Sequence, residues 1–252
     1  MAVFSRPGTS HNLSMGIVGL PNVGKSTLFN ALTLQSVPAE KFPFCTIEPE
    51  EGRVEFKDDR FDHLVNLYKP SSKVPAYLTI FDIAGLIKGA YKGEGLGNHF
   101  LDHIRRTDGI FHVVRCFDDT EVVHVDGDTN PLRDVKIIKD ELRFKDLEMI
   151  DNQMTAQKRA TVTDPIKKKF ESATYQKLKD TLEEKWANEA EWTQDEAKFI
   201  SGLNLFTTKE MIYLANISED DYINNNENKH LKSLMAAEKK RNFQQQIFVK
   251  IS

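Results

Sequence analysis

Short apolar runs alternate with helically spaced apolar positions along much of the chain. The runs are typical of strands at 15–20, 53–56, 76–82, 109–117, 211–216 and 246–251. Helical spacing is found at 25–33, 60–68 and 98–106, and in 60–68 it places Phe61, Leu64, Val65 and Tyr68 on one face. Strands that alternate with helices of this length predict an α/β fold with a mostly parallel, doubly wound sheet.

The pattern changes after Pro131. From Asp134 to Trp192 the chain is mostly charged, rich in Lys and Glu and without a convincing strand, and Thr161-Val162-Thr163-Asp164-Pro165 interrupts it. The insert is expected to span 134–203. Two apolar faces are expected, one from Val135, Ile138, Leu142, Lys145 and Met149, the other from Phe170, Leu178, Leu182 and Trp186. We predict a helical hairpin or short antiparallel coiled coil inserted between 15–133 and 204–252 of a discontinuous main domain. Two ordinary surface helices of that domain are the alternative.

The segment Gly19-Leu20-Pro21-Asn22-Val23-Gly24-Lys25-Ser26 has the full P-loop form, and it lies between the first predicted strand and helix. Its glycines let backbone N–H groups surround nucleotide phosphates at a helix start. We expect Asn22 to Thr27 to bind nucleotide, with Lys25 at the terminal phosphates and Ser26 on Mg²⁺.

Asp82-Ile83-Ala84-Gly85 follows a strand and matches the D-x-x-G of switch GTPases. Asp82 is expected to bind the Mg²⁺ ion through a water of its coordination shell. The Gly85 N–H is expected to contact the γ-phosphate and so to sense its presence. Thr46 is expected to complete the shell, although an ordinary turn threonine is the alternative. Leu86 occupies the position where many switch GTPases carry a glutamine that orients the attacking water. Leucine cannot do this, so either hydrolysis is very slow or another residue supplies the polar group.

The strand at 211–216 leads into Asn216-Ile217-Ser218-Glu219, where GTPases have N-K-x-D. Their aspartate accepts hydrogen bonds from guanine, whereas adenine offers it nothing to bind. Here Ile217 replaces the lysine and the longer Glu219 replaces the aspartate. We therefore predict that guanine preference is lost and that adenine is tolerated or preferred. A polar loop without a role in base recognition is the alternative.

The bulk composition favours a cytoplasmic protein. The chain has 252 residues, 40% hydrophobic, with a formal net charge of −4. This charge argues against nucleic-acid binding through overall charge, although it leaves room for a local basic patch, and we expect no DNA partner. Cys45 and Cys116 form no metal-like spacing and indicate a reducing compartment. We find no signal peptide and no apolar run long enough for a membrane span.

Further segments extend the motif set: Phe42 to Pro49, Lys88-Gly89-Ala90, Gly93 to Asn98 and Val113 to Phe117. Together with the P-loop, Asp82 to Leu86 and Asn216 to Glu219, they resemble the YchF/Obg-like ATPase family. The resemblance covers essentially the whole chain, most closely 15–150. It implies a P-loop NTPase G domain with a helical, coiled-coil-like insert that hydrolyses ATP more readily than GTP.

The resemblance also implies particular roles. A histidine on a mobile loop, matched here by His124, would replace the missing glutamine; a loop histidine without chemistry is the alternative. Phe117 and Ile217 match positions that line the nucleotide pocket, and Asn22 matches the asparagine of potassium-activated relatives, so K⁺ is a further expected ion. Association with the ribosome or rRNA is implied, and the runs Lys167–Lys169 and Lys239–Arg241 are candidate contacts or simply solvated surface.

Family members also carry a C-terminal TGS domain, which this sequence lacks, so a fragment or a truncation is expected. We expect a monomeric, Mg²⁺-dependent ATPase that acts as a switch. A nucleotide-gated binding module with negligible turnover and an ordinary GTPase are the alternatives.

Overall fold

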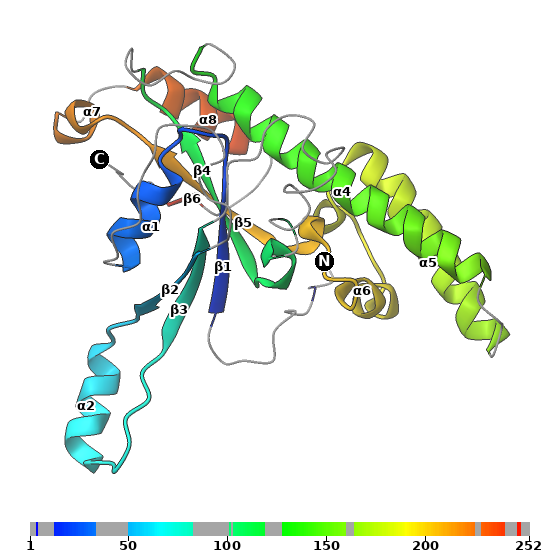
Figure 1. Cartoon of the computed structure of the whole chain (residues 1–252), viewed down its shortest axis with the longest axis horizontal. Coiled ribbons are helices and arrows are strands. Elements are labelled where there is room, and N and C mark those ends of the chain that lie inside the picture. The colour runs from blue at the N-terminus through cyan, green and yellow to red at the C-terminus, as the bar shows by residue number, and fades with distance from the viewer. Residues whose placement is uncertain are drawn as a thin grey trace.

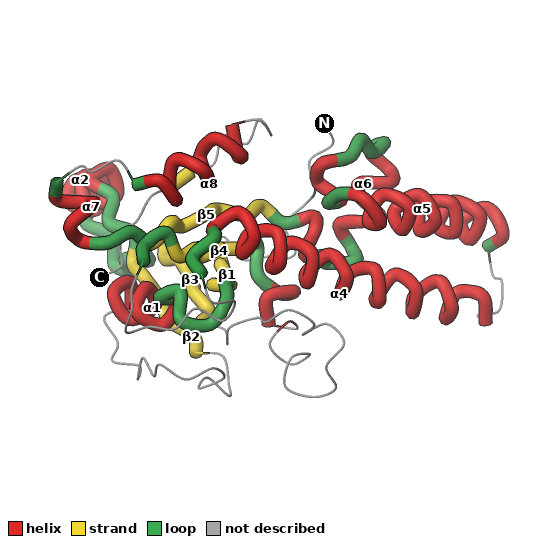
Figure 2. The backbone as a smooth tube through the Cα atoms, turned by 90° about the horizontal axis from the view of Figure 1, so that it is seen from above, coloured by secondary structure: helices red, strands yellow, loops and turns green. Residues whose placement is uncertain are grey.

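The computed structural model describes residues 4, 13–33, 50–82, 101, 103–118, 128–159, 164–224, 228–239 and 246–247. They form a six-stranded sheet in the order β2-β3-β1-β4-β5-β6, with α1 on one side and α8 on the other (Figures 1 and 2). The strands are β1 Leu13–Val18, β2 Glu50–Glu55, β3 Tyr77–Asp82, β4 Gly109–Arg115, β5 Glu210–Asn216 and β6 Gln246–Ile247. All pairings are parallel except that of β2 with β3. The predicted α/β class and mostly parallel sheet are confirmed.

Most strands begin or end one to three residues away from the predicted position, and two of these differences have a clear local cause. β1 ends at Val18 because the backbone turns at Gly19 into the P-loop, so 19–20 do not extend the strand. β2 begins at Glu50, three residues before the predicted start, although Glu50-Glu51-Gly52 looks like a loop. Gly52 faces α1, and a Cβ there would lie 2.1 Å from Thr33 Cγ2. The glycine therefore allows a close approach of strand and helix.

The helices beside the sheet cover its apolar side chains. They are α1 Lys25–Thr33 and α8 Lys229–Lys239, whereas the short helix α7 Glu219–Ile223 follows β5 and buries none of its residues. Leu28 and Phe29 of α1 pack with Ile17, Ile80 and Ile110 of the central strands in one buried core. Burial of these side chains gives the sheet most of its stabilisation, because each removes apolar surface from water.

A long helical hairpin extends from the sheet, as predicted. It consists of α4 Pro131–Arg159 and α5 Pro165–Glu184, which lie side by side in antiparallel orientation (Figure 2). The shorter α6 Gln194–Ser201 and the 3₁₀ turns η2 Ala187–Glu189 and η3 Phe206–Thr208 follow. The first half of α4 belongs to the core of the sheet, whereas its second half packs with α5 and α6 in a separate core.

The apolar face predicted for α5 needs one correction. Trp186 lies beyond the end of α5 and joins the core of the sheet, where its Nε1 donates to the Lys139 carbonyl at 3.3 Å. Phe170, near the start of α5, stays 38% exposed. The predicted Leu178 and Leu182 are confirmed on the packed face, where Tyr175 joins them.

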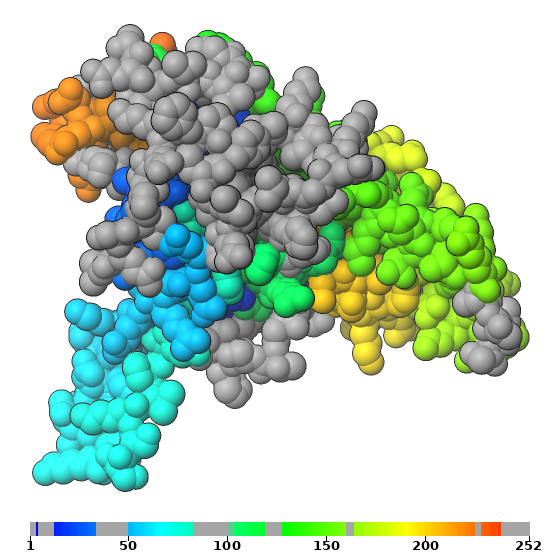
Figure 3. Space-filling model, in the orientation of Figure 1, coloured from blue at the N-terminus to red at the C-terminus, as the bar shows by residue number. Residues whose placement is uncertain are grey.

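The helix α2, Asp59–Tyr68, projects away from the molecule on the extended β2 and β3 (Figure 3, cyan). It is capped by Asp58, whose side chain accepts a hydrogen bond from the Arg60 N–H, and by Lys69 in the left-handed region at φ 45°. None of its ten residues, all within the described ranges, is buried. The apolar spacing predicted the helix correctly, and the structure leaves its apolar face open, since Leu64 is 53% and Tyr68 74% exposed.

A buried charged cluster joins α4 to the beginning of β5. The Asp146 carboxylate, on α4, accepts hydrogen bonds from the Phe206 N–H (3.2 Å), the Thr207 N–H (2.8 Å) and the Thr207 hydroxyl (2.8 Å). Arg105 lies 3.6 Å from the same carboxylate. Lys209 donates to the carbonyls of Arg105 and Thr107 at 3.0 and 2.5 Å. This cluster ties the helical hairpin to the amino-terminal edge of the sheet.

The stability of the chain is expected to fall at mildly acidic pH because of His112. This side chain is buried in the central strand β4, and burial, followed by the nearby positive charges of Lys139 and Lys25, lowers its pKa to about 3. Between pH 6.5 and 3 the unfolded chain therefore binds more protons than the folded one, and stability decreases as pH falls. From pH 7 to 5 this histidine alone should cost about 2 kcal/mol. Urea titrations of the wild type and His112→Leu measure this. An equally steep pH dependence in both would contradict it.

None of the helices in the described ranges has the length and hydropathy that a bilayer-spanning segment requires.

Candidate functional site

The predicted nucleotide-site residues that the structure describes gather at one edge of the sheet. The P-loop follows β1, Asp82 ends β3, Phe117 follows β4 and Asn216 ends β5. The strand register aligns them, since Asp82 pairs with Ile17 of β1 and Asn216 pairs with Arg115 of β4. The carboxyl edge of a parallel sheet is where ligands bind in open α/β folds.

The backbone of the P-loop depends on particular residues. Gly24 has φ 97° and Asn22 has φ 61°, both in the left-handed region that glycine and asparagine adopt most readily. A Cβ on Gly19 would lie 2.6 Å from the Val113 carbonyl oxygen of β4, so only glycine fits at this position. The Gly24 carbonyl accepts from the Leu28 N–H at 3.0 Å and starts α1. Val23 is buried and Thr27 is half-buried.

Lys25 is held inside the loop. Its ammonium group donates to the Leu20 carbonyl at 2.7 Å, and the side chain is only 7% exposed. Burial lowers its pKa to about 8, although the nearby Asp82 carboxylate opposes the change. Lys25 therefore remains protonated at neutral pH, at a desolvation cost that a bound phosphate would offset.

Ser26 and Asp82 form the candidate magnesium site. The Ser26 hydroxyl donates to Asp82 Oδ2 at 2.7 Å, and the carboxylate is 1% exposed. Two oxygen donors from α1 and β3 thus lie together next to Lys25, and Mg²⁺ prefers such donors. Both residues fit the ion and would hold it, Ser26 directly and Asp82 in its shell. The predicted partners Thr46 and Gly85 lie outside the described residues, as does His124.

The predicted base-reading loop contacts the P-loop. Asn216 Nδ2 donates to the Val23 carbonyl at 3.1 Å, while Asn216 Oδ1 is buried and accepts no hydrogen bond from the described residues. Ile217 packs against the core of the sheet. Ser218 caps α7 by accepting from the Asp221 N–H, and Glu219 begins that helix on the surface.

Sequence reasoning missed two residues that position this region. Arg115 is buried, stacks 4.6 Å over the Phe117 ring and donates from Nε to the Phe117 carbonyl. Asn228 donates to the Cys116 carbonyl and to Asp221, both at 2.7 Å, and caps α8 by accepting from the Leu231 N–H. An asparagine just before a helical apolar pattern was the available signal for Asn228. Arg115 in an apolar run gave no comparable signal.

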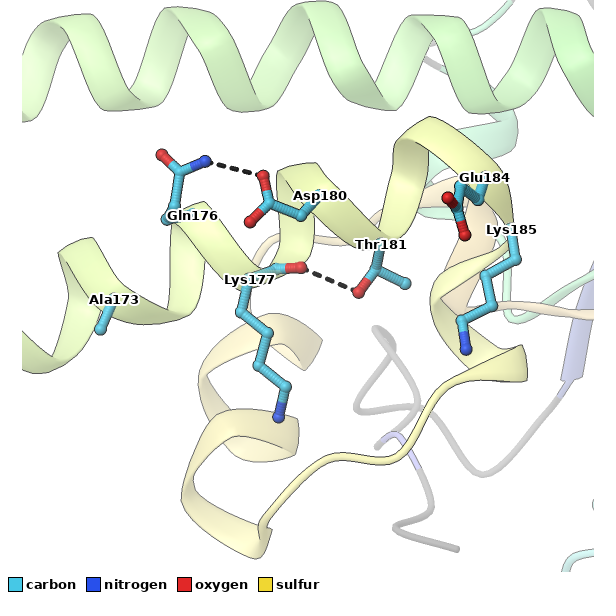
Figure 4. A pocket seen from close by; sticks show the side chains of 7 residues that line it. All are labelled: Ala173, Gln176, Lys177, Asp180, Thr181, Glu184 and Lys185. Atoms are coloured by element: carbon cyan, nitrogen blue, oxygen red, sulfur yellow. Dashed lines mark hydrogen bonds between the residues drawn. The ribbon is translucent and has the colours of Figure 1, made fainter.

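A hollow of about 620 Å³ lies along α5 and shares no residue with the nucleotide site (Figure 4). Its polar side chains contact one another: Gln176 donates to Asp180, and Thr181 donates to the Lys177 carbonyl. Lys177 also bonds Glu196 of α6. This open, internally paired surface offers no buried polar group for a ligand.

The fold and this site define a nucleotide-binding protein of the P-loop GTPase class. A family profile described as "50S ribosome-binding GTPase" matches residues 14–156. The structure of the Schizosaccharomyces pombe YchF GTPase superimposes with a TM-score of 0.78 at 41% identity, covering 100% of this chain and 68% of that one. The chain belongs to the YchF family of Obg-like ATPases.

Curated relatives agree with this assignment. Obg-like ATPase 1 of Caenorhabditis elegans is 50% identical over 224 residues, 88% of this chain and 56% of that protein. The protein of the same name from Gallus gallus is 49% identical over 225 residues, with the same coverage of both chains. The chain thus spans little more than half the length of these relatives.

Proposed function

We propose that the chain is a Mg²⁺-dependent P-loop NTPase that hydrolyses ATP, in preference to GTP, to ADP and phosphate. The observation that carries the proposal is the cluster of buried Lys25 with the Ser26–Asp82 pair at the carboxyl edge of the sheet. A buried ammonium group beside two oxygen donors suits a triphosphate with its cation.

Each side chain has a role in this proposal. Lys25 exchanges the Leu20 carbonyl for phosphate oxygens and stabilises the charge that develops during cleavage of the β–γ bond. Mg²⁺, when bound, neutralises charge on the β- and γ-phosphates. Thr46 and Gly85 sense the γ-phosphate, so that its loss switches the chain between two states, and His124 orients the attacking water. K⁺ at Asn22 is a further proposed ion.

The preference for ATP is inferred from the loop after β5. Asn216 joins this loop to the P-loop and leaves Oδ1 available for a base. Ile217 lacks the polar group of the usual lysine, and Glu219 lies in the first turn of α7 instead of ending the loop with a short acid. The relatives are named both as ATPases and as GTPases, so base preference is the property to measure first.

Competition between ATP and GTP for a fluorescent nucleotide tests base preference. The wild type is expected to bind ATP more tightly. The double variant Ile217→Lys/Glu219→Asp should shift the affinity ratio at least about tenfold towards GTP, or ~1.4 kcal/mol. Asp220→Glu changes the neighbouring exposed acid and should leave the ratio unchanged. If the wild type binds GTP at least ~100-fold more tightly than ATP, the chain is an ordinary GTPase and the preference proposed is wrong.

A binding module with negligible turnover is the second candidate, because Leu86 cannot orient water. Single-turnover measurement of phosphate release separates the two. Release that depends on Lys25 supports the enzyme, whereas release equal in the wild type and Lys25→Met supports the module.

We also propose that this chain acts as a cytoplasmic monomer that associates with the ribosome or its RNA. The description of the matching family profile, which names 50S ribosome binding, supports the association.

A further inference from the structure

The start of α8 contacts the segment Cys116-Phe117-Asp118, which follows β4 and which we call the β4 strap (Figure 1). Asn228 Nδ2 donates to the Cys116 carbonyl at 2.7 Å, across 112 positions of the chain. Two residues later, His230 Nε2 lies 3.2 Å from Asp118 Oδ1. The beginning of α8 therefore holds the strap at both of its ends, with Phe117 between them.

The side chain of Asn228 joins three elements. Its Nδ2 donates to the Cys116 carbonyl of the strap and to the Asp221 carboxylate of α7, both at 2.7 Å. Its Oδ1 accepts from the Leu231 N–H at 2.9 Å and caps α8. An asparagine amide has two N–H donors and one carbonyl acceptor, and the residue is only 9% exposed. Aspartate has no donor and serine has a single one, so neither could form all three hydrogen bonds.

The two groups that Asn228 bonds lie on opposite sides of the predicted base site. Cys116 directly precedes Phe117, a predicted wall of that site, and Asp221 lies in the helix that follows the base-reading loop. The Cys116 N–H also donates to the Asn216 carbonyl at 2.7 Å. The strap is thus bonded to the loop directly, through Asn216, and a second time through Asn228 and α7.

Phe117 is held from the side of the sheet as well. Arg115 stacks 4.6 Å over its ring, and Arg115 Nε donates to its carbonyl at 3.1 Å. The Thr129 hydroxyl donates to the same carbonyl at 3.3 Å. With Asn228 bonded to the preceding carbonyl, the backbone on both sides of this ring is fixed.

The contacts of Asn228 separate the base from the phosphates. Within the described part of the chain, its hydrogen bonds reach neither the P-loop nor the Ser26–Asp82 pair. A role limited to capping α8 would leave its two N–H donors without a purpose, because serine and aspartate cap helices about as well.

We propose that Asn228 is a positioning residue for the base of the nucleotide. It holds the β4 strap and α7 together, and so fixes the spacing between Phe117 and the loop after β5 before the base arrives. Residues that contact a ligand bind it more tightly when hydrogen bonds behind them fix their positions, because less conformational entropy is lost on binding. The inference rests on the nucleotide site proposed above and adds a residue that acts on the base alone.

Titration calorimetry with ATP and with inorganic tripolyphosphate tests the proposal, since tripolyphosphate fills the phosphate site but has no base. Asn228→Ser keeps a capping oxygen and removes the bridge between the strap and α7. It should weaken ATP binding at least about tenfold and leave tripolyphosphate binding within about twofold of the wild type. In turnover measurements KM should rise to the same extent while kcat changes little.

Two further variants separate the bridge from stability. Asp221→Ala removes only the α7 side of the bridge, at a half-buried position, and should weaken ATP binding about threefold without affecting tripolyphosphate. The matched control Asp164→Ala removes the cap of α5, which accepts from the Ile166 and Lys167 N–H groups. It should lower the thermal midpoint and leave both affinities unchanged. Thermal unfolding shows that each variant is folded.

Equal losses for ATP and tripolyphosphate in Asn228→Ser would show a general defect and overturn the proposal. Unchanged ATP binding in Asn228→Ser, or equal affinity of the wild type for ATP and tripolyphosphate, would overturn it too. If Asn228→Ser does not fold, Asp221→Ala decides by the same comparison. The proposed function fails by other results, namely no turnover or tighter binding of GTP by the wild type. The comparison with tripolyphosphate is then made with GTP and still decides the role of Asn228.

Discussion

Replacing Lys25 by methionine is expected to lower the rate of ATP hydrolysis about 10²–10³-fold, the usual effect of losing one charge-stabilising donor. The same change should leave the nucleotide-free chain as stable as the wild type or more stable. Lys25 is buried, and its lowered pKa records the cost of keeping the ammonium charge there. Methionine fills similar space without that cost, so function and stability should change in opposite directions. Phosphate release and thermal unfolding measure the two effects.

Lys209→Met is the matched comparison, because Lys209 is also a buried lysine whose pKa burial lowers to about 8. It lies at the opposite edge of the sheet, where it bonds two backbone carbonyls. Losing those bonds should cost about 1–3 kcal/mol of stability and leave turnover of the folded chain unchanged. If Lys25→Met retains turnover, or loses as much stability as Lys209→Met, the role assigned to Lys25 is wrong.

Removing the Asp146 carboxylate is expected to produce the largest loss of stability, about 3–5 kcal/mol in Asp146→Ala. The side chain is completely buried and accepts three hydrogen bonds, from Phe206 and Thr207. Burial raises the pKa of this carboxyl, while Arg105 and the hydrogen bonds oppose the rise. Alanine would leave the Phe206 and Thr207 N–H groups without their acceptor and would remove the carboxylate that lies 3.6 Å from Arg105. Urea unfolding of the purified variant measures the loss.

Asp151→Ala is the control, since Asp151 lies on the same helix but forms an exposed ion pair with Lys179. It should cost at most about 1 kcal/mol. Asp146→Asn keeps one oxygen acceptor, so its loss of stability should lie between those of Asp146→Ala and Asp151→Ala. Equal losses in Asp146→Ala and Asp151→Ala would mean that the buried cluster does not hold the hairpin to the sheet.

The sheet could be predicted because buried parallel strands are continuous apolar runs. Such runs are recognised in the local sequence, without reference to distant residues. The exposure of α2 could not be predicted, because amphipathic spacing shows which face is apolar and not whether anything covers it. The role of Asp146 was hidden for a related reason: its partners Phe206 and Thr207 are about sixty residues away. Only folding brings these groups together.

The phosphate-binding part of the site was predictable because its residues are consecutive and their types follow from the backbone turn. The Ser26–Asp82 contact spans fifty-six positions, yet the two motifs identified both partners. Arg115 and Asn228 were missed because their partners are backbone carbonyls, which any sequence provides. The roles of Thr46, Gly85 and His124 stay predictions.

The projecting arm of β2, α2 and β3 bears on how this chain changes over evolutionary time. Because no side chain of α2 is buried, substitutions there should stay mostly within about 0.5 kcal/mol of neutral. Mutations can therefore accumulate on α2 without bringing the protein near its unfolding threshold, whereas Gly52 at the base of the arm has no such freedom. A lineage is thus free to remodel the end of the arm for a new binding partner while selection preserves the site that binds nucleotide.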